Sequence, residues 1–269
     1  MPARGESMIE RVVEVLESFK GAGGPLTASE IARRTAIPMP SAHRIVAELV
    51  DVGFLERDPD RRLRIGTRLW EVVARSSSAL TLREVALPYM EDLRSAVQAP
   101  TLLSVLDRND VLNVETLSTR QPGVTNVTQP GVRLPALASS PGIVLVAFSP
   151  PEVREHILAT GKITRFTEHT VVDRAELLRI VNETRRTGYV VARRWISPDS
   201  TAIAVPILAD DGTAIGALSV TTAFGADAPS TLLPALHATA LGISRATRTA
   251  DGPRLTLLKQ QIRHATEVP

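Results

Sequence analysis

The chain has 269 residues, enough for two domains of roughly 150 residues each. Its hydrophobic share of 43% is too high for a disordered protein, and the absence of cysteine excludes disulfides, zinc fingers, iron–sulfur clusters and thiol nucleophiles. No apolar run approaches the about 20 residues of a membrane span, and residues 1–8 lack a signal-peptide core, so we expect a cytoplasmic protein without a membrane partner. A formal net charge of +2 is too small to indicate a nucleic-acid partner by itself. Evidence for such a partner must therefore come from the local placement of basic residues.

The first seventy residues predict a winged helix-turn-helix. Apolar periodicity indicates three helices, at about 8–19, 27–35 and 39–52. The first should bury one face made of Ile9, Val12, Val13, Leu16 and Phe19. Capping boxes start the first two helices, at Ser7 with Glu10 and at Thr27 with Glu30. Two strands, 54–57 and 62–65, then flank the turn signal Asp58-Pro59-Asp60-Arg61.

In a winged helix-turn-helix, the helix after the turn enters the major groove and its N-terminal residues contact base edges. We therefore expect six DNA-contacting residues: Ser41, His43 and Arg44 on the third helix, and Arg61, Arg62 and Arg64 on the wing. Ser41 and Arg44 would contact bases, and the wing arginines would contact the phosphate backbone. The alternative is a small helical domain whose polar face is merely solvated and which contacts protein.

The rest of the chain predicts an α+β domain after a helical linker. Residues 66–98 carry apolar stripes at helical spacing, interrupted by Ser76-Ser77-Ser78 and Pro88, and a helix of this kind suits packing or dimerisation rather than ligand binding. From residue 101 the pattern predicts strands at 101–106, 111–117, 201–208 and 214–222, and helices at 140–148, 152–160, 174–187 and 232–248. The expected domains are therefore a DNA-binding domain at 1–68, a linker at 69–98, an α+β domain with an antiparallel sheet at 99–250 and a tail at 251–269, which adds a last amphipathic helix.

Several stretches resemble the IclR family of bacterial transcription regulators. They include Leu26-Thr27-Ala28-Ser29-Glu30-Ile31-Ala32, Pro38-Met39-Pro40-Ser41-Ala42-His43-Arg44-Ile45, Gly131-Val132-Arg133-Leu134-Pro135 and Ala217-Leu218-Ser219-Val220. The resemblance extends over nearly the whole chain and implies a GAF-like effector domain and dimers or tetramers. The family usually has a lysine before its His/Tyr-Arg pair, where this chain reads Met39-Pro40-Ser41, so one phosphate-facing cation is missing.

The resemblance also implies an effector pocket. The residues that match its lining are Ser139, Ser140, Gly142, Arg194, Trp195, Asp199, Thr201, Ala202 and Ser219. Amides and hydroxyls at a helix start suit an anion. Arg193 and Arg194 stand where the family often has acidic residues, Asp199 replaces a common glycine, and Ala202 replaces a pocket cysteine. Together with the aromatic face of Trp195, these departures favour a small organic anion with an apolar body. The alternatives are that the serines only cap and pack, that the arginines face solvent, and that Trp195 packs in the core or against a partner subunit.

The sequence contains no catalytic, metal or phosphate-binding motif. There is no Gly-x-Ser-x-Gly elbow, no phosphate loop and no pair of histidines at metal-ligand spacing among the five histidines. We therefore expect no enzyme, no metal and no cofactor. The predicted function is a transcription regulator that binds a double-stranded DNA operator as a homo-oligomer and responds to a small-molecule effector. The alternative is a small-molecule-binding or catalytic α+β protein whose N-terminal module contacts protein.

Overall fold

The computed structural model describes residues 7–119, 128–226 and 229–250. The chain divides into two compact units, Met1–Ser77 and Ser78–Pro269. The expected tail helix at 251–269 lies outside the described residues. None of the described helices is long and apolar enough to cross a membrane.

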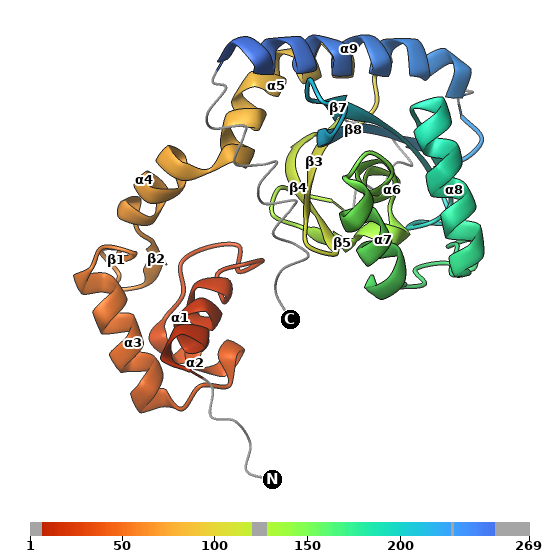
Figure 1. Cartoon of the computed structure of the whole chain (residues 1–269). Helices are drawn as coiled ribbons and strands as arrows, with labels where there is room; N and C mark the ends of the chain where they lie inside the picture. The colour runs from red at the N-terminus through yellow and green to blue at the C-terminus, as the bar shows by residue number, and fades with distance from the viewer. Residues whose placement is uncertain (1–6, 120–127, 227–228, 251–269) are drawn as a thin grey trace. The chain divides into compact units, whose positions relative to one another are not determined.

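The first unit is a winged helix-turn-helix (Figure 1). Its elements are α1 (Met8–Glu17), α2 (Ala28–Thr35), α3 (Met39–Asp51), the wing strands β1 (Leu55–Arg57) and β2 (Leu63–Ile65), and α4 (Thr67–Ser76). Both expected capping boxes are present, with Ser7 and Thr27 accepting the N–H groups of Glu10 and Glu30. The core joins all three helices to the wing through Val15, Ile31, Ile45, Leu55 and Leu63.

Two glycines permit close backbone approaches that a side chain would block. A Cβ on Gly66 would lie 2.2 Å from the Gly53 carbonyl oxygen, where the end of β2 passes the end of α3. A Cβ on Gly142 would lie 2.1 Å from the Ala136 carbonyl oxygen, where the next unit's central helix begins. Both contacts exclude any larger residue without backbone movement.

The prediction for α1 was partly wrong. Val15 is its fully buried residue, with Val12, Leu16 and Phe19 packed partly against the core. Ile9 is 76% exposed and Val13 is 48% exposed. The helix is amphipathic as expected, but its apolar stripe is wider than the face that the small domain covers.

The segment expected as one linker is two helices that belong to different units. The serines do interrupt it, since α4 ends with Ser77 in an extended conformation and α5 (Ser78–Val97) begins directly afterwards. Pro88, expected as a second break, lies inside α5 without ending it. Leu82, Ala86, Met90 and Leu93 of α5 are buried in the core of the second unit.

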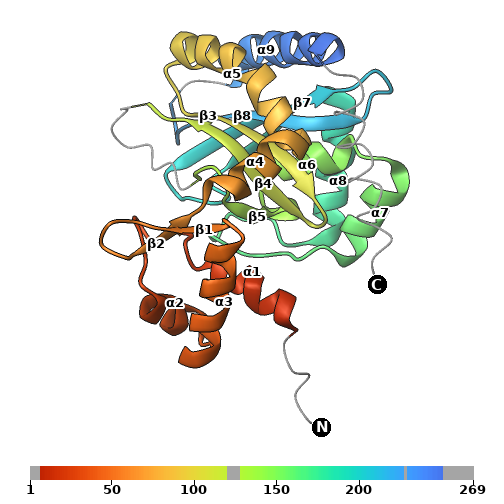
Figure 2. The same cartoon turned by 90° about the vertical axis from the view of Figure 1, so that its left-hand side faces the viewer.

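The second unit is a six-stranded antiparallel sheet between two layers of helices (Figures 1 and 2). Its strands are β3 (Thr101–Asp107), β4 (Asp110–Leu117), β5 (Arg133–Pro135), β6 (Val190–Arg193), β7 (Ser200–Leu208) and β8 (Ala214–Ala223), in the spatial order β5-β4-β3-β8-β7-β6. Its other helices are the 3₁₀ turn η1 (Ala136–Ala138), α6 (Ser140–Ala147), α7 (Pro151–Thr160), α8 (Arg174–Thr187) and α9 (Pro229–Ala250). Among the described residues, β5, η1 and β6 are elements that periodicity did not predict, because each is only three or four residues long.

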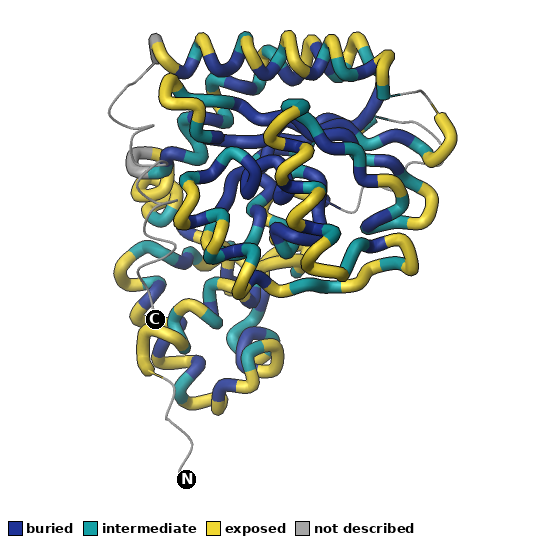
Figure 3. Tube along the Cα trace, turned by 45° about the vertical axis from the view of Figure 1, so that its right-hand side comes forward, coloured by how far each residue is buried: buried dark blue, intermediate teal, exposed yellow. Residues whose placement is uncertain are grey.

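Each face of the sheet has its own apolar core. One face packs against α5 and α9 through residues such as Leu103, Ile203 and Leu218. The other packs against α6, α7 and α8 through Leu106, Ala204 and Ala217. Helix α6 is buried on nearly every side (Figure 3), which explains why its sequence is almost entirely apolar. The start of α6 and the sheet face beneath it hold most of the expected effector residues.

Candidate DNA interface and effector site

Helix α3 presents a polar face because its apolar residues point inward. Ala42, Ile45, Val46 and Leu49 are buried in the domain core. His43 and Arg44 are exposed and Ser41 is half-buried on the first two turns of the helix. Arg44 Nη1 lies 3.4 Å from Glu48 Oε1, with both side chains more than half exposed. An exposed pair of this kind is weak, so the guanidinium is available to another acceptor.

The three wing arginines differ in their contacts. Arg61 is exposed at the wing tip in a left-handed conformation with φ 60°, and its side chain has no partner among the described residues. Arg64 Nη2 donates to Glu56 Oε2 at 3.0 Å. Arg62 turns back toward the helices, donating to the Pro25 carbonyl at 3.2 Å and to Glu30 Oε2 at 3.2 Å. Arg61 is therefore the wing cation best placed for a phosphate.

Arg62 holds the wing onto the helical part of the domain. Beside it, Leu26 and Leu63 exchange two backbone hydrogen bonds of 2.8 and 2.6 Å. Glu30, which caps α2, accepts the Thr27 N–H at 2.7 Å and also receives Arg62. The Thr27 hydrogen bonds, aided by the nearby Arg62 charge, lower the pKa of the Glu30 carboxyl. Arg62 therefore has a structural role within the domain, in addition to the DNA contact predicted for it from the sequence.

The start of α6 holds the first group of expected effector residues. Ser139 is the N-cap, and its Oγ accepts the Gly142 N–H at 3.3 Å. Position 142 must be glycine because its backbone lies so close to the Ala136 carbonyl that a Cβ would collide with it. Ser140 is 1% exposed, and its Oγ has no hydrogen-bond partner among the described residues. Because an unpaired buried hydroxyl costs free energy, Ser140 is the residue of this group that most needs an external partner.

Strand register separates the expected sheet residues by face. Ser219 pairs with Ala204, and Ala202 pairs with Ala192, so both lie on the face that α6 covers. Thr201 pairs with Thr222 and directly precedes Ala202, so its side chain points to the opposite face. The expectation that Thr201 shares a site with Ser219 is therefore corrected by the two-residue period of the strand.

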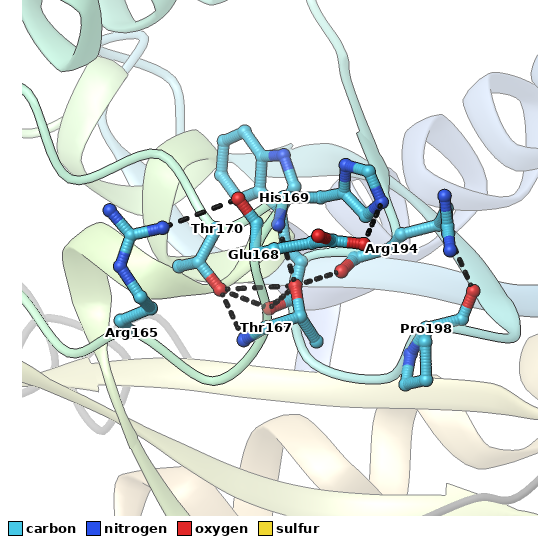
Figure 4. A network of polar contacts seen from close by, with 8 residues as sticks. Arg165, Thr167, Glu168, His169, Thr170, Arg194 and Pro198 are labelled. Carbon is cyan, nitrogen blue, oxygen red and sulfur yellow. Dashed lines mark hydrogen bonds and ion pairs between the residues drawn. The ribbon is translucent and has the colours of Figure 1, made fainter.

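The loop after β6 is held by a second loop between α7 and α8 (Figure 4). Thr167 Oγ1 donates to the Arg194 carbonyl at 2.5 Å, and Thr170 Oγ1 donates to the Trp195 carbonyl at 2.6 Å. The Trp195 side chain is 8% exposed and packs in the core beside α6. Arg194 donates from Nε to the Pro198 carbonyl at 2.8 Å, and its guanidinium lies 5.1 Å from the Phe224 ring centre.

Asp199 is exposed on the same loop and its carbonyl accepts the Phe224 N–H at 2.8 Å. Trp195 thus lies against the same core as Ser219, whereas Arg194 and Asp199 make contacts on the outer side of the loop. The structure thus agrees with the alternative expectation for Trp195, that it packs in the core.

Two further polar residues on the α6 face were missed by sequence reasoning. Ser104 and Asn113 are opposite one another on β3 and β4, and they are 2% and 3% exposed. Asn113 Nδ2 donates to Thr116 Oγ1 at 2.5 Å, while its Oδ1 has no partner among the described residues. Both residues lie two positions from core residues of this face, Leu106 and Val111, but the apolar pattern does not mark a serine and an asparagine as buried.

The described part of the chain contains no group of His, Asp and Glu residues that could hold a metal ion.

Comparisons with known proteins agree over both units. A model described as the IclR helix-turn-helix domain matches residues 8–59, and one described as the bacterial transcriptional regulator IclR C-terminal matches residues 74–245. The chain is 29% identical to the HTH-type transcriptional regulator KipR of Bacillus subtilis over 182 residues, which is 68% of this chain and 72% of KipR. These descriptions are of transcription regulators rather than enzymes.

Solved structures give the same result. An IclR homologue from Microbacterium hydrocarbonoxydans, crystallised with 4-hydroxybenzoate, is 43% identical and has a TM-score of 0.82, covering 90% of this chain and 99% of its own. A second homologue, from Microbacterium sp. strain HM58-2, is 42% identical with a TM-score of 0.59, covering 91% of this chain and 100% of its own. The likeness therefore spans the DNA-binding and effector units together.

Proposed function

Because the chain belongs to the IclR family of DNA-binding transcription regulators, we propose that it binds a specific operator and that a small organic anion modulates this binding. The observation that best supports sequence-specific operator binding is the exposure of Arg44 on α3. Arginine is well suited to a guanine edge because its guanidinium donates two parallel hydrogen bonds. Arg61 at the wing tip supplies a phosphate contact that does not depend on sequence. A cytoplasmic location follows from this role.

The effector proposal rests on the α6 face of the sheet. Ser140 Oγ and Asn113 Oδ1 are buried polar atoms without partners in the described structure, and Ser219 is 3% exposed on the same face. Trp195 adds an aromatic surface to the same core. The 4-hydroxybenzoate in the Microbacterium homologue supports a carboxylate with an aromatic body as the ligand class.

We also propose that the functional species is a homodimer or a tetramer of such dimers. Two winged helices in symmetry-related positions read two half-sites, which a single domain cannot do. The first unit leaves large apolar side chains exposed on α1 and α4, including Ile9 at 76% and Trp70 at 59%. Exposed apolar surface of this extent suits contact with a second copy.

Selection of bound duplexes from a random pool, followed by gel retardation over a salt series, tests operator binding. We expect one enriched motif with two related half-sites, and an affinity that falls steeply as salt rises. Retardation is then repeated with 4-hydroxybenzoate, benzoate, an aliphatic carboxylate and a neutral aromatic alcohol. A response to the neutral alcohol that equals the response to the carboxylates would contradict the anion. Failure to enrich any motif would contradict operator binding.

A further inference from the structure

A pocket outside the proposed effector residues opens between the end of α6, the end of α8, the turn joining β7 to β8, and α9. We call it the α8–α9 pocket. It has a volume of about 580 Å³, within the roughly 300–1,000 Å³ typical of small-molecule sites. Its apolar lining includes Phe148, Pro206 and Leu241, and the last of these is 47% exposed on α9.

The charge of this lining is unbalanced. Arg185, Arg186 and Arg248 face one carboxylate, Asp210. Arg248 Nε binds Asp210 Oδ1 at 2.7 Å, which ties α9 to the β7–β8 turn. Arg186 is held from the side by Glu183, which binds its Nη2 at 2.5 Å and its Nε at 3.0 Å. Within the described chain, exposed Arg185 has no hydrogen-bond or ion-pair partner, so one cation at the rim is uncompensated.

The groove on the other side of α8 provides a comparison within the same unit. That groove has a volume of about 470 Å³ and is lined by Glu176, Glu183, Arg179 and Arg193, so its charges are equal in number. The positive excess of the α8–α9 pocket is therefore a property of that pocket and not of the helix surface in general. His237 also lines the pocket, with its ring edge-on to Tyr189 at 6.4 Å between centres.

We propose that the α8–α9 pocket is a second ligand site, which takes a small organic carboxylate with an apolar body. The carboxylate binds Arg185 at the rim, and the apolar body lies on Phe148 and Leu241. Arg248 remains paired with Asp210 and closes one wall. The site contains none of the residues proposed for the effector site, although Phe148 and Leu208 of its lining also pack against the core beside α6. We therefore expect its occupancy to be independent of the effector proposed above.

Nuclear magnetic resonance of the full chain with ¹³C-labelled histidine tests this site directly, with 1-naphthoate as the probe. The His237 Cε1–H resonance is assigned with the His237→Gln variant. We expect it to shift saturably as 1-naphthoate is added, and the same shift is expected in Ser219→Leu, which obstructs the α6 face. Loss of the His237 shift in Ser219→Leu would overturn independence of the two sites.

The charge-reversal variant Arg185→Glu should weaken this binding about tenfold, because attraction to the carboxylate becomes repulsion. Arg179→Glu is the matched control, since it makes the same charge change on the same helix in the neighbouring groove and should leave the affinity unchanged. An unmoved His237 resonance would overturn the site. Equal weakening by both variants would also overturn it, because that result indicates only general attraction to a basic surface.

Discussion

At the residue scale, neighbouring arginines and serines have different roles because their contacts differ. Arg44 and Arg61 are exposed with weak or no partners, whereas Arg62, next in the chain to Arg61, is bound to Pro25 and Glu30. Ser139 and Ser140 are also adjacent, but Ser139 caps α6 while the Ser140 hydroxyl is buried without a partner in the described structure. Both comparisons can be tested by single substitutions.

Replacement of Arg44 by alanine should weaken specific operator binding by about 1–3 kcal/mol and relax the preference at one base pair. Arg61→Ala should instead weaken binding to all sequences similarly and reduce the salt slope by about one phosphate contact. Retardation over a salt series, on the selected operator and on unrelated DNA, measures both effects. Identical profiles for the two variants would contradict the division into a base contact and a phosphate contact.

Ser140→Ala should leave the free energy of unfolding unchanged or raised, because it removes an unpaired buried hydroxyl. The same variant should weaken effector binding, since the ligand loses that partner. Ser139→Ala is the matched comparison and should lower the free energy of unfolding by about 1 kcal/mol through loss of the cap. Denaturant unfolding and titration of Trp195 fluorescence, in a Trp70→Phe background, measure the two properties. Unchanged ligand affinity in Ser140→Ala would remove Ser140 from the site.

At the element scale, the wing is part of the domain's stability as well as of its DNA interface. Strand β2 is joined to the segment before α2 by the Leu26–Leu63 bridge, and Arg62 links the same strand to the cap of α2. Glu56 on β1 similarly accepts the backbone N–H of Thr67 at 2.7 Å, which satisfies the start of α4. The wing therefore connects α2 to α4.

The lowered pKa of Glu30 gives this connection an acid dependence. The Glu30 carboxylate stabilises the fold above its ordinary pKa of 4.5, and this contribution is lost as the pH falls through the lower pKa of the folded state. Glu30→Gln keeps an oxygen for the Thr27 N–H but does not titrate. We expect the hydrogen-exchange protection factors of the Leu26 and Leu63 amides, which correct for the pH dependence of intrinsic exchange, to fall less between neutral pH and pH values below 4.5 in this variant. An equal fall in the wild type and the variant would show that Glu30 does not provide the dependence.

Arg62→Ala should open the Leu26–Leu63 bridge at neutral pH. If Arg62 were only a phosphate contact, the substitution would instead lower DNA affinity uniformly across sequences. Hydrogen exchange at Leu26 and Leu63 should increase several-fold, while Arg61→Ala leaves it unchanged. The salt slope of DNA binding should change less for Arg62→Ala than for Arg61→Ala. A normal exchange rate with a reduced slope would restore Arg62 as a DNA contact.

At the scale of the whole molecule, the two units divide the work. The first unit carries the helix proposed to read DNA and leaves apolar residues of α1 and α4 exposed. The second buries its own core on both faces of one sheet, with α5 incorporated into it, and exposes fewer large apolar side chains among its described residues. We therefore place the proposed interface between copies on the first unit's exposed apolar side chains.

Trp70→Glu should shift the chain toward monomer, because a charge replaces a large apolar side chain at the proposed interface. Sedimentation velocity at micromolar concentration measures the shift, and operator affinity should fall with it. Glu71→Lys, a charge change at the next residue of α4, is the control for the charge of the helix and should remain an oligomer. A wild-type chain that is monomeric at this concentration, yet binds its operator tightly, would contradict the proposal.

The sequence alone determined the family and the types of most elements, but not the short elements β5, η1 and β6. Capping boxes, the Asp58–Arg61 turn and helical periodicity act over a few residues, so they are readable without the fold. What only the tertiary structure decided is which side chains meet. The two-residue strand period places Ser219 and Asn113 on the α6 face and Thr201 on the other. Contacts between distant segments turn Arg62 inward, bury Trp195 and leave Ile9 exposed. These outcomes depend on long-range packing, which local propensity does not encode.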